Sequence, residues 1–243
     1  MLFNRFSLCS LLVSSAKEFK SARKATGYKI IVNKSTVPIG SGDWVSMMIS
    51  ESIEANNSKN VSFDVVSNPE FLREGNAVGD TFFPDRIVIG SSSKKAIDKM
   101  LALYKPLIEQ TFDWPDDKRL IPEGQKVPVV VTDLTSAEMI KYASNSFLAT
   151  KISFINEIAN ICEKVGADVK DVARGMGLDK RIGLLFLNAG IGWGGSCFPK
   201  DVKGMIQTAN ENEIGFEILD SVESTNEAQK KSLLPKIQKL LGE

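Results

Sequence analysis

The chain has 243 residues, of which 43% are hydrophobic, and its 30 basic and 30 acidic side chains cancel to a net charge of zero. This balance argues against a nucleic-acid partner, since such proteins carry a basic excess or stripe, and no apolar run approaches the ~20 residues of a membrane-spanning helix. The absence of histidine excludes a Ser-His-Asp triad, a Cys-His pair and a histidine metal site, so acid–base chemistry falls to Asp, Glu, Lys, Tyr or Cys.

The first half of the chain alternates between predicted helices and strands. We expect helices at 7–25, 44–55 and 94–104, and strands at 28–33, 61–68 and 85–90. Alternating strands and helices are typical of βα units around a mostly parallel sheet. The segment 113–128 is rich in proline and charge, which predicts a linker or a long loop.

The second half is predicted to be entirely helical. Residues 134–165 contain neither proline nor glycine, Asp133 can cap their start, and Gly166 can end them. A helix of this length spans roughly 48 Å, which suits the spine of a helical domain or a subunit contact. A short helix at 167–177 and a final helix from 216 towards 234 are expected to follow.

The three cysteines, Cys9, Cys162 and Cys197, are widely separated and form no CxxC pair. Their number and spacing predict neither a zinc site nor a disulfide framework, so we expect no metal and a reduced, cytoplasmic protein. The first 16 residues only faintly resemble a signal peptide, because their apolar run is short and is broken by Cys9 and Ser10.

The stretch GWGGSCFPKD, residues 192–201, places a cysteine at a predicted helix start. Pro199 suits the first turn of a helix. The helix dipole and the charge of Lys200 would favour a thiolate at Cys197, while Asp201 could exchange protons. The residues alone leave two readings open, a reactive cysteine or a glycine-rich turn with an incidental one.

The stretch SNPEFLREG, residues 67–75, follows a predicted strand. Asn68 can cap a helix, Pro69 suits its first position, and Glu70 and Glu74 are four residues apart, hence on one helical face. These carboxylates either face a ligand or merely complement a helix N-terminus.

Two further groups are placed where ligands bind in open α/β sheets or helical clefts. NKSTVP, residues 33–38, ends the first predicted strand, and ligands meet loops at the carboxyl ends of strands. Lys141 and Asn145 are four residues apart on the long predicted helix. The alternative for residues 33–38 is an ordinary loop that follows a strand. The alternative for Lys141 and Asn145 is a solvated polar stripe on the helix.

Taken together, these stretches match a family pattern. In chain order they read KIIVNKSTVPIG, SNPEFLREGNAV, FPDRIVIG, AEMIKYASNSFLATKISFINEIANICEKVGADV, RIG with FLNAG, and GGSCFPKD. From about Tyr28 to Gln229 the chain resembles the UDP-glucose 6-dehydrogenase family of nucleotide-sugar dehydrogenases. The resemblance implies an α/β plus all-α fold, in which a partial Rossmann-type parallel sheet precedes a helical central domain, 6-phosphogluconate-dehydrogenase-like, built on one long helix.

The resemblance also implies a two-step oxidation of UDP-glucose to UDP-glucuronate with NAD as cofactor. Cys197 matches the nucleophile that captures the aldehyde as a thiohemiacetal and then forms a thioester, which water hydrolyses. Lys141 would stabilise the oxyanion, and Glu70 matches the family's acid–base glutamate. The groups that would hold or activate water and orient the sugar are Asp201, Thr36 and Asn145.

Binding roles follow from the same resemblance. Thr36, Glu74 and Lys200 correspond to positions that contact NAD, and Arg181 matches an arginine that reaches the sugar nucleotide from the neighbouring subunit. The sugar-nucleotide pocket would be formed by Glu70, Phe71, Leu72, Lys141, Asn145, Phe186, Leu187 and Gly194.

The resemblance divides the chain into four parts. Residues 1–115 correspond to the second half of the NAD-binding domain, 116–127 to a linker, 128–215 to a helical central domain that forms a homodimer, and 216–243 to the start of a helix leading to a missing C-terminal domain. No G-x-G-x-x-G follows an opening strand, so the first half of the NAD-binding domain is expected to be absent. We therefore expect an inactive or weakly active fragment.

Two alternatives stay open. The chain could belong to a dehydrogenase of another nucleotide sugar, GDP-mannose or a UDP-N-acetylhexosamine, because the domain that reads the base is expected to be missing. It could instead be a non-catalytic protein that keeps the long helix as a dimerisation module. The joint presence of Cys197, Lys141, Asn145, Glu70 and Asp201 argues against this second alternative.

Overall fold

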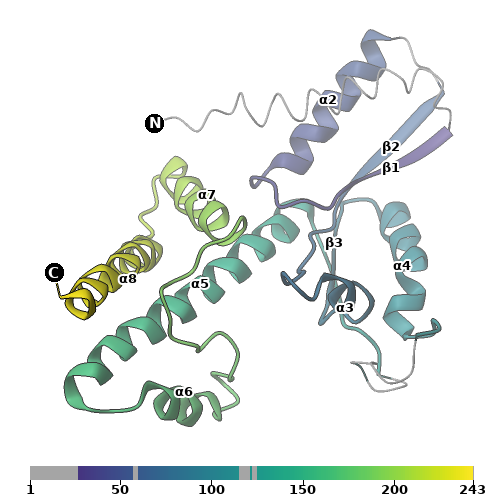
Figure 1. Cartoon of the computed structure of the whole chain (residues 1–243). Helices are drawn as coiled ribbons and strands as arrows, with labels where there is room; N and C mark the ends of the chain where they lie inside the picture. The colour runs from purple at the N-terminus through teal and green to yellow at the C-terminus, as the bar shows by residue number, and fades with distance from the viewer. Residues whose placement is uncertain (1–26, 57–59, 115–120, 122–124, 243) are drawn as a thin grey trace. The chain divides into compact units, whose positions relative to one another are not determined.

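The computed structural model describes residues 27–56, 60–114, 121 and 125–242. The predicted helix at 7–25, Cys9 and much of the predicted linker lie outside these residues. The chain divides into two compact units between Lys141 and Tyr142. Figure 1 draws the helices and strands of each unit. Within the described ranges, no helix is both long enough and apolar enough to cross a membrane.

The first unit contains a four-stranded sheet in the order β1-β2-β3-β4, with bounds Gly27–Asn33, Val61–Ser67, Ile87–Gly90 and Val129–Thr132. β1 and β2 run parallel from the pair Gly27↔Val61 to the pair Asn33↔Ser67. β3 and β4 are also parallel, whereas β2 meets β3 antiparallel through a single pair, Ser67↔Gly90. The sheet is therefore mixed, with two of its three strand pairs parallel as expected.

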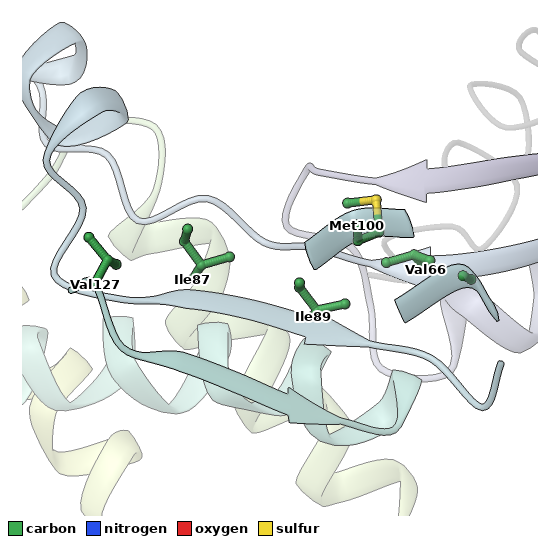
Figure 2. Packing of buried hydrophobic residues seen from close by; sticks show 6 residues of the cluster. Val66, Ile87, Ile89, Met100 and Val127 are labelled. Carbon is green, nitrogen blue, oxygen red and sulfur yellow. The ribbon is translucent and has the colours of Figure 1, made fainter. Parts of the chain in front are cut away.

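In the described part of this unit, three helices accompany the sheet, namely α2 (Ser41–Ala55), α3 (Ala77–Phe82) and α4 (Lys94–Glu109). α4 packs against β2 and β3, and the Ser93 side chain caps its start by accepting the amide of Ala96. The buried core lies at this contact, as Figure 2 shows for Val66, Ile87, Ile89, Met100 and Val127. Burying side chains of this size stabilises the fold by about 1.5–3 kcal/mol each.

The prediction that Asn68 caps a helix beginning at Pro69 is wrong. Residues 68–73 are irregular, a turn follows, and α3 begins only at Ala77. Asn68 does not cap a helix because its side chain donates to the carbonyl of Val88 in β3. Glu70 instead accepts the amide of Leu72, two residues on, which closes a local turn.

The second unit is helical, as predicted. Its elements are most of α5 (Leu134–Val165), then α6 (Val169–Gly177), α7 (Phe198–Glu211) and α8 (Glu217–Leu241). The bounds of α5 are those that the sequence predicted. Its start is capped by Asp133, which accepts the amide of Ser136 at 2.8 Å, and Gly166 ends it with a φ of 78°. The domain limits expected from the resemblance stay predictions.

Two helices continue past the ends that the sequence predicted. The expected ends at 104 and 234 each stop shortly before a proline, but α4 passes through Pro106 and α8 through Pro235. A proline inside a helix removes one backbone hydrogen bond and strains the preceding turn, which surrounding structure can absorb.

Candidate active site

The loops after β1 and β2 leave the sheet side by side. The strands are parallel, and beyond their ends the amide of Asn68 donates to the carbonyl of Asn33 at 2.8 Å. The loop after β1 carries Thr36, which is half-buried, and the loop after β2 carries Glu70. This edge of the sheet therefore brings together two of the predicted site segments.

Asn68 anchors the second of these loops. Its side chain is buried, donates to the carbonyl of Val88 at 2.7 Å, and accepts from Lys34 Nζ at 2.8 Å and from the Tyr104 hydroxyl at 2.5 Å. The sequence suggested Asn68 only as a cap, although an asparagine directly after a buried strand is a signal for such an anchor. The anchor fixes the backbone directly before Glu70.

Glu70 and Lys141 form an ion pair. Lys141 Nζ lies 3.5 Å from Glu70 Oε1, with side-chain exposures of 5% for the lysine and 30% for the glutamate. The same ammonium lies 5.1 Å from the centre of the Phe71 ring. A charge as buried as that of Lys141 needs a nearby partner, so the structure joins three predicted site residues through contacts that stabilise the lysine.

Phe71 also contacts Arg86, which the sequence analysis did not single out. The guanidinium lies 3.8 Å from the ring centre, and burial lowers the pKa of Arg86. Phe71, Leu72, Glu70 and Arg86 all line a cavity of about 160 Å³. The aromatic ring with two cations against it provides a wall that suits an anionic or polar ligand.

The turn that carries Glu74 is held by an ion pair between Arg73 and Asp80. The Arg73 side chain donates to both carboxylate oxygens of Asp80, and its backbone amide donates at 2.7 Å. These bonds from Arg73 lower the pKa of Asp80, against the opposing effect of burial. Glu74 itself is exposed and shares no helical face with Glu70, contrary to the spacing argument.

Glu138 is a buried carboxylate that the sequence analysis missed. It is 3% exposed and accepts the amides of Gly40 at 2.7 Å and Gly42 at 2.8 Å, at the start of α2. Burial raises the pKa of Glu138, against these hydrogen bonds, and the nearby charge of Asp43 raises it further. Glu138 lies one turn before Lys141 on α5, and α5 thereby holds the loop that carries Thr36.

In the helical unit, Cys197 occupies the cap position of α7 and is exposed. The carbonyl of Cys197 accepts the amide of Asp201 at 2.9 Å, and Pro199 lies in the first turn of the helix. Cys162 is buried. The sequence prediction of a helix beginning directly after Cys197 is therefore confirmed.

Asp201 lies one turn inside α7 and is completely buried. Its Oδ2 accepts from Asn145 Nδ2 of α5 at 2.6 Å, and its Oδ1 accepts from Lys200 Nζ at 2.6 Å. The three side chains are thus joined in one hydrogen-bonded group, which satisfies the buried carboxylate.

The remaining predicted residues lie on the irregular segment between α6 and α7. Arg181 is exposed and donates to the Asp179 carboxylate, with Nη2 to Oδ2 at 2.6 Å. Phe186 has a φ of 64° and its ring lies 6.3 Å from that of Phe198, while Leu187 is buried and Gly194 is exposed.

The predicted residues therefore form two groups, one in each unit. The α/β unit holds Thr36, Glu70, Phe71, Leu72, Glu74 and Lys141. The helical unit holds Asn145, Arg181, Phe186, Leu187, Gly194, Cys197, Lys200 and Asp201. α5 contributes to both groups, since Lys141 and Asn145 are four residues apart on it. Among the residues with described positions, no three Cys, Asp or Glu side chains gather as metal ligands.

Two family models match the chain. The model of the UDP-glucose/GDP-mannose dehydrogenase family, NAD binding domain, matches residues 9–108. The model of the same family's central domain matches residues 135–228. The two matches are consecutive and correspond largely to the α/β and helical parts.

Individual relatives agree with these matches. The UDP-glucose 6-dehydrogenase TuaD of Bacillus subtilis is 50% identical over 216 residues, which is 89% of this chain and 42% of that protein. A UDP-glucose dehydrogenase structure from Pyrobaculum islandicum matches with a TM-score of 0.82 and 36% identity, over 96% of this chain and 49% of that one. A GDP-mannose dehydrogenase structure from Pseudomonas aeruginosa matches with a TM-score of 0.58 and 28% identity, over 96% and 49%. The chain thus spans less than half the length of these relatives.

Proposed function

The chain belongs to the UDP-glucose/GDP-mannose dehydrogenase family, and on this premise we propose that it carries residues for the NAD-dependent oxidation of UDP-glucose to UDP-glucuronate. The observation that carries the proposal is an exposed cysteine at a helix start, one turn before a buried carboxylate with two partners. NAD, when bound, accepts the hydride removed from C6 in each of the two oxidations.

Cys197 is the proposed nucleophile. Its thiolate adds to the C6 aldehyde that the first oxidation produces, forming a C–S bond, and the carbonyl oxygen takes up a proton. Loss of hydride and of that proton in the second oxidation leaves a thioester. Water then adds to the thioester carbonyl, the C–S bond breaks, and the thiol and the UDP-glucuronate carboxylate are released. The position of Cys197 supports this role, since unpaired amides at a helix start favour a thiolate.

Lys141 and Glu70 are proposed to serve the reacting oxygen. The Lys141 ammonium is buried and forms an ion pair with Glu70. A negative charge that develops on a nearby substrate oxygen would therefore be stabilised in poorly solvated surroundings. Glu70, at 30% exposure, is accessible enough to exchange a proton with substrate or water.

Asp201, Asn145 and Thr36 are the proposed residues for water and sugar. The Asn145–Asp201 bond fixes the orientation of both side chains, which suits groups that must present one oxygen or one amide to a ligand. Thr36 lies on the loop held beside Asn68 and supplies a hydroxyl at the same edge of the sheet as Glu70.

The residues present fit a nicotinamide cofactor at the carboxyl edge of β1 and β2, where dinucleotides bind in open α/β sheets. The Asn33–Asn68 backbone bond supports this, because it sets the Thr36 and Glu74 loops beside each other. Thr36 and Glu74 would hold the cofactor from this unit, and the resemblance assigns a cofactor contact to Lys200 as well.

The sugar nucleotide is proposed to meet Phe71, Leu72, Phe186, Leu187 and Gly194, with Arg181 serving the neighbouring subunit of a homodimer. Arg181 projects from the surface, which supports a role outside its own subunit.

Phe147, Phe154 and Ile161 recur at seven-residue intervals on α5 with exposures of 65%, 47% and 56%, and such a stripe suits a helix–helix contact. Light scattering at micromolar concentration tests the dimer, and a monomer would contradict it.

The sugar is tested by protection of Cys197 from alkylation. UDP-glucose should slow iodoacetamide modification of Cys197, whereas GDP-mannose and UDP-N-acetylglucosamine at equal concentration should not. Cys162, which is buried, is the internal control. Equal protection by GDP-mannose would favour the other dehydrogenase named in the family description, and protection by none of the three nucleotide sugars would contradict the proposed substrate class.

A further inference from the structure

The glycine-rich segment before Cys197 is held from two sides by four polar side chains. Ser153 and Asn156 lie three residues apart on α5, and Asn226 and Gln229 lie three residues apart on α8, so each pair shares one face of its helix. We call these four side chains the bracket. They make hydrogen bonds to Gly190 and Trp193.

Asn226 makes the strongest part of the bracket. Its side chain is 1% exposed, its Oδ1 accepts the Trp193 amide at 2.8 Å, and its Nδ2 donates to the Trp193 carbonyl at 3.0 Å. Both hydrogen-bonding groups of one backbone residue are thus paired with a single side chain. A buried amide with both ends satisfied in this way specifies one position for that residue, because any displacement leaves polar groups unpaired.

The rest of the bracket fixes the same segment. The Trp193 indole N–H donates to Ser153 Oγ at 2.9 Å. The Gly190 amide donates to Asn156 Oδ1 at 2.8 Å, and Gln229 Nε2 donates to the Gly190 carbonyl at 2.8 Å. A glycine is required at position 192, between Gly190 and Trp193. The backbone there has a φ of 106°, and a Cβ would lie 2.5 Å from Asn226 Oδ1.

A contact continues from the bracket to the cysteine. The Trp193 ring packs edge-on against Phe198, with ring centres 6.3 Å apart, and Phe198 directly follows Cys197 at the start of α7. Residues 194–197, between the two aromatic rings, are all exposed. The place of the thiol is therefore set by Trp193 and Phe198 at either end of a short exposed segment.

We propose that Asn226 is a positioning residue for Cys197, acting through Trp193 and Phe198, and that α8 thereby controls the reactivity of the thiol. The inference rests on the proposed role of Cys197 as nucleophile. Removing the Asn226 amide frees the Trp193 backbone, the Phe198 contact loosens, and Cys197 loses its fixed place at the start of α7. The thiol is then no longer held beside the unpaired amides at the start of α7.

The test measures the rate of iodoacetamide alkylation of Cys197 against pH, by peptide mapping of the folded chain. Asn226→Leu removes both bonds at similar size, and Asn226→Asp keeps an acceptor for the Trp193 amide but loses the donor. The control is Lys236→Gln, which removes a different α5–α8 contact, the ion pair with Glu163. It lies ten residues further along α8, about 15 Å away.

We expect Asn226→Leu to slow the alkylation of Cys197 at neutral pH by about tenfold, since the thiol then loses its fixed place at the start of α7. Asn226→Asp should fall between it and the wild type, and Lys236→Gln should match the wild type. A wild-type profile in a folded Asn226→Leu chain would overturn the inference. If that variant does not fold, an unchanged profile in Asn226→Asp overturns it equally. Failure of the proposed function would show differently, as a wild-type Cys197 that reacts no faster than Cys162.

Discussion

The two units hold their proposed catalytic carboxylates in opposite ways. In the α/β unit, Glu70 is 30% exposed and faces Lys141 across 3.5 Å. In the helical unit, Asp201 is fully buried and has two partners at 2.6 Å. Asp201 therefore stabilises its unit in addition to its proposed role in the site, whereas Glu70 remains accessible to a ligand. Substitutions should therefore separate stability from chemistry.

The largest expected effect is that of Asp201→Ala. It leaves Asn145 with a buried unpaired amide and removes the partner of Lys200, so we expect a loss of about 2–4 kcal/mol in the free energy of unfolding. The estimate lies below that for a fully buried ion pair because the Lys200 side chain is 54% exposed and can turn to solvent. Urea unfolding followed by circular dichroism measures it, with Asp201→Asn as the isosteric control. A loss no larger than that of Glu70→Gln would contradict the stabilising role of Asp201.

Glu70→Gln should have a smaller effect on stability. The substitution leaves the buried Lys141 ammonium without its carboxylate, but the Glu70 side of the pair is 30% exposed, which weakens the pair relative to one that is buried on both sides. We expect a loss of about 1 kcal/mol in the free energy of unfolding. The same urea titration measures it, and Glu74→Gln, in an exposed turn, is the matched control with no expected loss. An equal loss in both glutamine variants would show that the Lys141 contact contributes nothing.

The smallest expected effect is a pH dependence at Glu138. Burial raises the pKa of Glu138 in the folded chain above its unfolded value. A group with a raised folded pKa contributes stability at low pH, and this contribution is lost as the pH rises through the folded pKa. The free energy of unfolding of the wild type minus that of Glu138→Gln should therefore decrease as the pH rises from about 4.5 towards neutrality. A difference that increases with pH would contradict the assignment.

The sequence predicted those elements whose signals are local. α5 was predicted to the residue, because 134–165 lacks glycine and proline and has Asp133 and Gly166 at its ends. The start of α7 behind Cys197 was likewise predicted from Pro199. Local signals failed where a distant partner decides the structure. Asn68 pairs with β3 in place of capping a helix, and its position after a buried strand does not indicate which distant residue is its partner.

The same distinction applies to the candidate site. Residues within one motif, such as Cys197, Lys200 and Asp201, were found together from their spacing. The supporting residues Glu138, Arg86 and Asn226 were missed, because each acts on a segment far from it in the chain. The residues next to each of them in the sequence do not indicate that distant partner.

The identity of the nucleophile is tested most directly by alkylating the folded wild-type chain with iodoacetamide at neutral pH and mapping the modified peptides. The structure places Cys197 exposed at the start of α7 and Cys162 buried in the helical unit. We predict that Cys197 is modified first and that Cys162 reacts only after unfolding. Preferential modification of Cys162 in the folded chain would contradict the assignment of Cys197 as the nucleophile.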